Sequence, residues 1–156
     1  MRKLRRKDKQ ITMEEAQALL TVSEHGILST VDTDGQPYGV PLNYVYTNEA
    51  IYFHCALQGH KIENIENNPR VSFCVVADTE VLPADFSTNY VSTVVFGVAS
   101  EVEGEERYNA LMGLLEKYSP DYLEEGKKYI EKLDTVTKVF KIDIQQLAGK
   151  KAPAKA

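Results

Sequence analysis

Apolar and polar residues alternate along much of the chain, as they do in strands that bury one face of a sheet. The pattern predicts six strands, which cover residues 27–31, 38–46, 51–55, 71–77, 90–103 and 137–144. Segments of turn-forming residues, DTDGQP and TNEA, separate the first three strands. These three strands are therefore expected to form a meander.

Four stretches have helical character instead. Thr12 and Glu15 form a capping box at the start of the first helix, which we expect to end at Gly26 in a left-handed conformation. A short second helix is expected after Gly59, and two more helices lie between the fifth and sixth strands. An apolar stripe marks the first of these two: Tyr108, Leu111, Leu115 and Tyr118.

Six antiparallel strands with few helices predict a mainly β fold, a closed or nearly closed β-barrel with flanking helices, because closure removes exposed sheet edges. The length of 156 residues fits one domain. We divide the chain into a basic, flexible N-terminal segment (residues 1–10), the barrel domain (11–148) and a flexible C-terminal tail (149–156).

Composition is that of an ordinary soluble protein, with 43% apolar and 26% charged residues. No apolar run is long enough to cross a bilayer, and the first residues are too basic and polar for a signal peptide. We therefore expect a cytoplasmic protein without a membrane partner. In a reducing cytosol, Cys55 and Cys74 are expected to be buried thiols and not a disulfide.

The net charge of −5 is unevenly distributed. Residues 1–9 carry +5 and residues 149–156 carry +3, which leaves −13 for the residues between them. So acidic a body would repel nucleic acid, and no nucleic-acid partner is expected. The basic N-terminal run is interpreted as a solvated terminus, with a nucleic-acid arm as the alternative.

The strongest candidate for chemistry lies in FHCALQGHKIENIENNP (residues 53–69), where Gly59, His60 and Lys61 begin a helix. A helix start presents unpaired N–H groups and favours anions, and a lysine adds a full positive charge. Glycine lets the backbone approach a ligand closely. These residues suit a phosphate cradle, while a plain loop with a surface lysine is the alternative interpretation.

Other polar residues on the strands are weaker signals. His54 is flanked by aromatic residues and is interpreted either as a hydrogen-bonded core residue or as a catalytic one. Asn43 and Ser92 could each face a ligand from a neighbouring strand. No phosphate-binding loop, dinucleotide fingerprint or nucleophile elbow is present, and the histidines and cysteines lack zinc spacing, so no metal site is expected.

Four segments resemble a known family: GILSTVDTDGQPYGVPLNYVY, IYFHCALQGHKIENIENNPRVSFCVV, STNYVSTVVFGVASEVE and FKIDIQQLAGK. They are similar to the pyridoxamine 5′-phosphate oxidase-related flavoproteins, and most to their 5-nitroimidazole resistance (Nim-like) branch. The resemblance covers about residues 11–150. It implies a six-stranded antiparallel Greek-key split barrel of the FMN-binding type and a homodimer with FMN at the subunit interface.

The resemblance also implies roles for individual residues. A segment of the second strand would line the slot for the isoalloxazine ring: Leu42, Asn43 and Tyr44. The phosphate end would be served by a second group: His54, Gly59, His60, Lys61 and Asn64. Ser92 would complete the site from either subunit, and Lys150 would approach the flavin. His54 matches a family histidine near the flavin ring and substrate, so it is the expected catalytic residue.

The function implied is electron transfer from reduced FMN, supplied by a small-molecule donor, to a small acceptor such as a nitroaromatic compound. Two alternatives stay open: a flavin-binding or sensing protein with little turnover, and a haem-binding variant with His54 or His60 as axial ligand. Oxidation of pyridoxamine phosphate is not expected. The chain has no tryptophan, and its only arginines beyond the N-terminal segment are Arg70 and Arg107.

Overall fold

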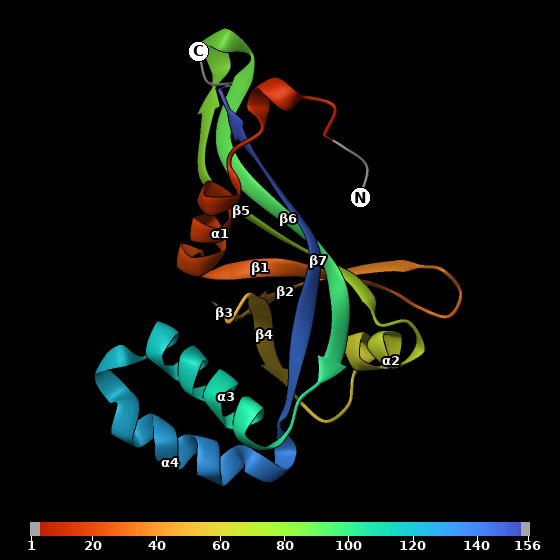
Figure 1. The fold of residues 1–156 in the computed structure, drawn as a ribbon, viewed down its shortest axis with the longest axis vertical. Helices are drawn as coiled ribbons and strands as arrows, with labels where there is room; N and C mark the ends of the chain where they lie inside the picture. Colours follow the sequence, from red (N-terminus) through yellow and green to blue (C-terminus); the bar gives the residue numbers. More distant parts are fainter. Residues whose placement is uncertain (1–3, 154–156) are drawn as a thin grey trace.

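One antiparallel sheet of seven strands forms the body of the protein in the computed structural model, which describes residues 4–153 (Figure 1). The strand order in the sheet is β2-β1-β5-β6-β7-β4-β3. The strands are β1 (His25–Val31), β2 (Pro37–Asn43), β3 (Val45–Thr47), β4 (Ala50–Cys55), β5 (Arg70–Leu82), β6 (Ser87–Glu101) and β7 (Lys138–Ala152). The mainly β prediction is confirmed, and the predicted number of six strands is wrong.

The seventh strand arises because the predicted strand 38–46 breaks at Tyr44 into β2 and β3. Side chains at the end of helix α3 (Gly104–Tyr118) take the place of a neighbouring strand there. The backbone N–H of Tyr44 donates to the Tyr118 hydroxyl at 3.0 Å, and its carbonyl accepts from Lys117 Nζ at 2.9 Å and from the Tyr118 hydroxyl at 3.0 Å. The chain can therefore leave β1 and pair with β4 directly afterwards.

The sheet is not closed, contrary to the expectation of a closed or nearly closed barrel. β2 and β3 follow each other in the chain but occupy opposite edges of the sheet. The sheet curls so that β2 also contacts β4, yet no ladder joins the two edges. The side-chain hydrogen bonds at Tyr44 occupy the backbone groups that would otherwise continue the ladder, which keeps the barrel split.

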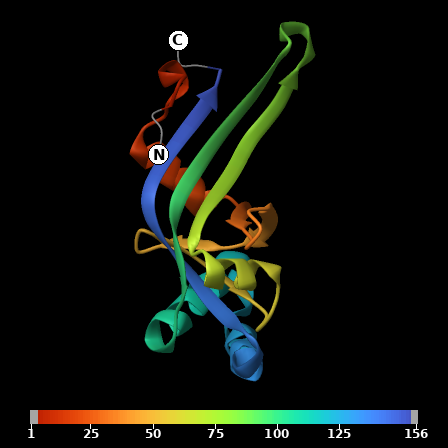
Figure 2. The same ribbon diagram turned by 90° about the vertical axis from the view of Figure 1, so that its right-hand side faces the viewer.

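The hairpin formed by β5 and β6 is longer than predicted and projects from the body as a two-stranded arm (Figure 2). Its outer part has a polar sequence, and the 3₁₀ helix η2 (Pro83–Asp85) closes its tip. A register shift between Ala77 and Glu80 accompanies the positive φ of 51° at Asp78. Because both faces of the arm meet solvent, its strands need no apolar alternation, and the pattern did not reveal them.

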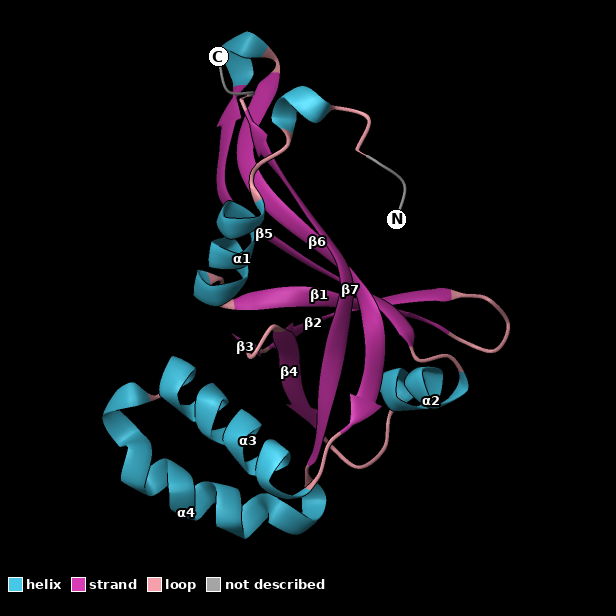
Figure 3. Ribbon diagram, in the orientation of Figure 1, coloured by secondary structure: helices cyan, strands magenta, loops and turns pink. Residues whose placement is uncertain are grey.

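Four α-helices flank the sheet (Figure 3). They are α1 (Met13–Val22), α2 (His60–Asn67), α3 and α4 (Leu123–Leu133). The capping box of Thr12 and Glu15 is confirmed, but the predicted left-handed cap at Gly26 is wrong. The helix ends at the extended residue Ser23, and Gly26 lies within β1, where an added Cβ would lie 2.3 Å from the Phe73 ring.

Residues near both predicted ends of the domain pair with each other. β7 runs past residue 148 to Ala152, and its last residues are paired with β6. Gln10 forms a bridge with Lys150, and the N–H of Ile11 donates to the Gly149 carbonyl at 3.2 Å. The remaining 3₁₀ helices are η1 (Lys7–Lys9), η3 (Pro120–Tyr122) and η4 (Asp134–Val136). Residues 1–3 and 154–156 of the predicted terminal segments lie outside the described residues.

Two apolar clusters hold the elements together. The larger one fills the curl of the sheet, and its fully buried side chains include Leu20, Tyr44, Phe53 and Phe73. The smaller one lies under α3 and includes Val45, Tyr52, Leu111 and Leu114. Tyr108, predicted on the buried stripe of α3, is instead 49% exposed. Cys55 and Cys74 are half-buried free thiols, and no helix among residues 4–153 could span a membrane.

Candidate functional site

The start of α2 has the form that the sequence predicts. The helix begins at His60, and Gly59 is its N-cap with a positive φ of 147°. The Gly59 carbonyl accepts from the N–H groups of Ile62 and Glu63, at 2.9 and 3.1 Å. A Cβ added to Gly59 would meet nothing within 4 Å, so the space in front of the helix is open. Glycine offers no capping side chain, which leaves the first N–H groups of the helix available to an anion.

Lys61 brings a positive charge to the first turn of α2. Its side chain is half-buried, and among residues 4–153 no carboxylate forms an ion pair with it. Next to it, His60 packs against Tyr38 with ring centroids 4.2 Å apart. A lysine in the first turn of a helix with free N–H groups favours a dianion, because the charge and the helix dipole both attract it. We call Gly59, His60 and Lys61 the cradle.

His54 is placed close enough to the cradle to be influenced by its charge. It lies on β4 opposite Val139 of β7 and is exposed. The alternative interpretation of His54 as a hydrogen-bonded core residue is therefore wrong. Although His54 is exposed, partial desolvation by the surrounding side chains lowers its pKa, and the positive charge of Lys61 lowers it further. The imidazole is therefore largely neutral at pH 7 and can either donate or accept a hydrogen bond.

Three of the predicted site residues lie in or against the core. Tyr44 is fully buried, and its hydroxyl donates to the Leu20 carbonyl at 2.6 Å. Asn64 is 2% exposed and donates from Nδ2 to the hydroxyl of Thr30 at 2.9 Å. Leu42 is half-buried and packs against the larger apolar cluster. Within this subunit Tyr44 and Asn64 thus support the fold around the cradle.

Ser92 and Lys150 lie elsewhere. They are directly paired across β6 and β7, on the half of these strands nearer the hairpin tip, whereas β4 and α2 lie toward the other end (Figures 1 and 2). Both line a second hollow of about 510 Å³ together with Tyr90 and Phe96. A single subunit therefore does not bring Ser92 and Lys150 to the cradle.

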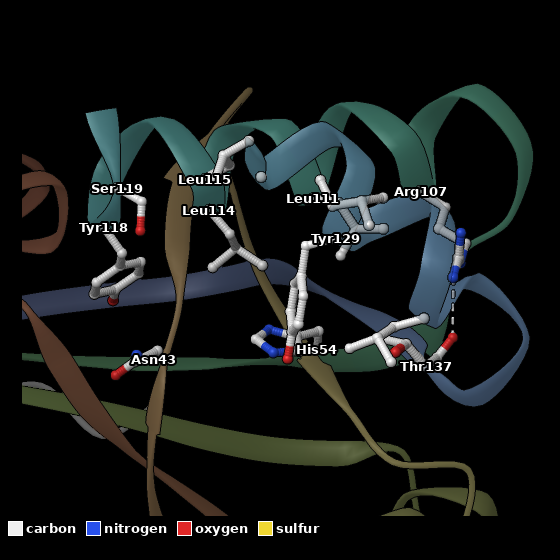
Figure 4. Close-up of a pocket in the computed structure, with 13 residues that line it drawn as sticks. Asn43, His54, Arg107, Leu111, Leu114, Leu115, Tyr118, Ser119, Tyr129 and Thr137 are labelled. Carbon is white, nitrogen blue, oxygen red and sulfur yellow. Dashed lines mark hydrogen bonds between the residues drawn. The ribbon is translucent and has the colours of Figure 1, made fainter. Parts of the chain in front are cut away.

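A cavity of about 240 Å³ opens beside His54, between β4 and the helix pair α3–α4 (Figure 4). The pattern of the sequence did not identify it. Its walls are apolar side chains of both helices: Leu111, Leu114, Leu115, Ile130 and Leu133. Asn43, exposed at the end of β2, lines the same cavity. The apolar spacing of α4 was the available signal, because Ile130 and Leu133 recur on one face.

Arg107 is the cation of this cavity, and its hydrogen-bonding capacity is largely used. Its guanidinium pairs with the carboxylate of Asp134. It also donates to the carbonyls of Asp134 and Thr137, at 3.0 and 3.1 Å, the second of which is drawn in Figure 4. Among residues 4–153, no cluster of three or more histidine, cysteine or carboxylate side chains is arranged to hold a metal ion.

Comparison with known proteins points to one family. A family profile described as pyridoxamine 5′-phosphate oxidase matches residues 12–151. A candidate 5-nitroimidazole antibiotic resistance protein from Bacteroides thetaiotaomicron has a similar fold, with a TM-score of 0.78 and 24% identity over 90% of this chain and 85% of that chain. Comparison with curated proteins gives no match.

Two further solved structures are described by what they bind. An FAD-binding protein from Mesorhizobium loti is 27% identical, with a TM-score of 0.65 over 92% of this chain and 97% of that chain. A haem-binding protein from Mycobacterium smegmatis is 25% identical, with a TM-score of 0.66 over 86% of this chain and 51% of that chain.

Proposed function

The chain belongs to the pyridoxamine 5′-phosphate oxidase family, and from this premise we propose that it is an FMN-dependent oxidoreductase that passes electrons to a small acceptor. The observation that carries the proposal is the cradle. Among residues 4–153, Lys61 has no carboxylate partner, and it stands in the first turn of a helix that has no side-chain cap and has open space at Gly59. A phosphate dianion satisfies all three, and a charge-assisted contact of this kind contributes about 1.5–3 kcal/mol.

In this mechanism the residues of the chain would hold the cofactor and orient the electron acceptor. FMN supplies the redox chemistry when it is bound. Lys61 would neutralise the phosphate, and Gly59 would let it approach the N–H groups of His60 and Lys61. His54 faces the neighbouring cavity, where its neutral imidazole would hydrogen-bond a bound acceptor and orient it. The apolar walls under α3 and α4 exclude water from that contact.

Pyridoxamine phosphate is a poor candidate for the acceptor site. A phosphorylated substrate needs cations of its own in addition to those that hold the cofactor. Arg107, the cation of the cavity beside His54, is occupied by Asp134 and by two backbone carbonyls. We therefore propose an unphosphorylated acceptor.

A homodimer is proposed as the form that completes the flavin site. Exposed apolar side chains lie on one face of neighbouring strands, with Ile27 40%, Val76 55% and Phe96 42% exposed. Val76 is paired with Ser92, which is paired with Lys150, so these residues share that face. Packing this face against a second copy would bury the apolar side chains and bring Ser92 and Lys150 to a subunit interface.

The proposal is tested by titrating FMN into protein stripped of flavin and following the flavin absorbance and fluorescence. We expect saturable binding, and binding about ten-fold weaker or worse in Lys61→Ala, because one charge-assisted contact is lost. Lys128→Ala, on the exposed face of α4, is the control and should bind normally. Protein that leaves the spectrum of added FMN unchanged would contradict the proposal.

Haem is a second candidate, because His54 and His60 are both exposed and each could offer an imidazole nitrogen to the iron. Addition of haem would then produce a sharp Soret band, and either His54→Ala or His60→Ala would abolish it. If both variants keep the band, or wild type gives none, haem is excluded as the ligand of these histidines. A bound flavin that no acceptor reoxidises faster than oxygen does would favour a sensing role.

A further inference from the structure

The cavity between β4 and the helix pair α3–α4 is separate from the cradle, and His54, which lines the cavity, is close enough to Lys61 of the cradle to feel its charge. Leu111 and Leu114 project into it from α3, and Tyr129 projects into it from α4 (Figure 4). Gly126 of α4 also lines it, and a Cβ there would lie 2.1 Å from the Leu115 side chain. Glycine at this position lets the two helices lie close together, which fixes the roof of the cavity.

The lining of the cavity offers polarity without net charge. The guanidinium of Arg107 is held by the Asp134 carboxylate and two carbonyl oxygens. The remaining polar groups of the lining are uncharged side chains such as Asn43 and Thr137, together with His54. Burial and Lys61 lower the pKa of His54, so it too is largely neutral near pH 7. A charged ligand would lose its hydration here without gaining a counter-ion.

The volume of the cavity limits the ligand to about one substituted ring. A dry cavity of about 150 Å³ lined by Leu, Ile and Phe takes up benzene in another protein, whereas sites for drug-sized ligands and cofactors span about 300–1,000 Å³. The present cavity, at about 240 Å³, lies between these values. It has room for one aromatic ring with a substituent, and it is too small for a whole flavin nucleotide.

We propose that this cavity is a binding site for an uncharged single-ring aromatic molecule whose one polar substituent hydrogen-bonds His54. The role of this molecule as the electron acceptor rests on the proposed function. Its binding in the cavity is independent of that function. Leu111, Leu114 and Ile130 surround the ring, and the neutral imidazole selects an amide, hydroxyl or similar uncharged group over a carboxylate or an ammonium group.

Three probes of nearly equal shape test the selection for charge: benzamide, benzoate and benzylamine. Each is titrated at pH 7.5 into protein stripped of flavin, and binding is followed by the NMR signals of the leucine and isoleucine methyl groups. We expect benzamide to bind and to shift the methyl signals of Leu111, Leu114 and Ile130. Benzoate and benzylammonium should bind at least ten-fold more weakly.

Substitutions in the cavity lining test whether benzamide binds there. Ile130→Phe fills the space and should reduce benzamide binding at least ten-fold, while Val22→Phe, at a position 72% exposed on α1, should leave it unchanged. Leu133→Phe serves the same purpose if Ile130→Phe does not fold. His54→Ala removes the hydrogen bond and should weaken benzamide about two- to ten-fold.

FMN is titrated into the same samples, so that the two proposals fail separately. Benzamide binding without FMN binding would overturn the proposed function and leave this inference standing. FMN binding with no methyl shifts at millimolar benzamide would overturn the inference alone. Equal affinity for benzoate, or unchanged benzamide affinity in the cavity-filling variants, would overturn it as well.

Discussion

Two lysines of the protein have opposite surroundings. Lys117 donates to the carbonyls of Ser23 and Tyr44, at 2.7 and 2.9 Å, and lies 3.9 Å from the centre of the Tyr44 ring. Lys61 has no ion pair among the described residues and is the second residue of α2. The first therefore stabilises the fold, whereas the second has charge to offer a ligand.

Replacement of Lys117 by Met is expected to lower the free energy of unfolding by about 1–2 kcal/mol, because two carbonyl oxygens lose their charged donor. Urea unfolding measures this, with Lys128→Met as an exposed control. Burial lowers the pKa of Lys117 to about 8, from 10.5 in the unfolded chain. Between these values the unfolded chain binds more protons at this site, so the stability of wild type relative to Lys117→Met should rise with pH. A flat or falling difference would contradict this assignment.

His54 should report the charge of Lys61 directly. Burial and then Lys61 lower its pKa, so Lys61→Gln is expected to move the His54 titration midpoint upward, toward but not fully to the ordinary value. NMR titration of the imidazole carbon-bound proton measures the midpoint. Lys128→Gln serves as control. An unchanged midpoint in Lys61→Gln would place the lysine too far from His54 for a shared site.

At the scale of elements, the pairing of β6 with β7 depends on a close backbone approach at Gly97. The register of the two strands shifts between Phe96 and Gly97. A Cβ at Gly97 would lie 2.4 Å from the backbone oxygen of Asp143. Since the backbone on both sides is fixed by the ladder, the strands cannot separate there without losing hydrogen bonds, and this close approach positions the β7 segment that pairs with β4.

Gly97→Ala is therefore expected to lower the free energy of unfolding by about 1–3 kcal/mol, the usual cost of overpacking. Gly39→Ala is the matched control. Gly39 is also a strand glycine, but an added Cβ there would lie 3.6 Å from Ile27, which is an ordinary contact distance. The free energy of unfolding of Gly39→Ala should therefore differ from that of wild type by less than about 0.5 kcal/mol. Thermal or urea unfolding of both variants compares them. Equal stability of the two would mean that the strands can separate at Gly97 at little cost.

At the scale of the whole molecule, the proposed dimer rests on the exposed face that carries Val76 and Phe96. Val76→Glu places a charge on that face and should convert a dimer of about 35 kDa, twice the 17.5 kDa chain, into a monomer. Light scattering measures the mass, and FMN titration should show weaker binding in the same variant. Val22→Glu is the exposed control. Wild type that binds FMN fully as a monomer would contradict the proposed dimer.

The sequence predicted the parts that depend on local signals. Thr12 and Glu15 correctly predicted one helix start, and Gly59 to Lys61 predicted another. Both predictions were possible because helix capping depends on residues only a few positions apart in the sequence. The break at Tyr44 was not visible, since Lys117 and Tyr118 lie 73 and 74 residues further along the chain. The cavity beside His54 escaped notice for a similar reason, as its walls come from β4 and from two distant helices.

The capture of Tyr44 by α3 has a consequence for hydrogen exchange. The amide proton of Tyr44 sits between two strands but is bonded to a phenol oxygen on a helix, and not to a neighbouring strand. Its exchange with deuterium should follow fraying of the C-terminal turn of α3, while the amides of β1 and β2 on one side and β4 on the other follow the sheet. One peptide group within the barrel wall thus registers the motion of a helix that roofs the neighbouring cavity.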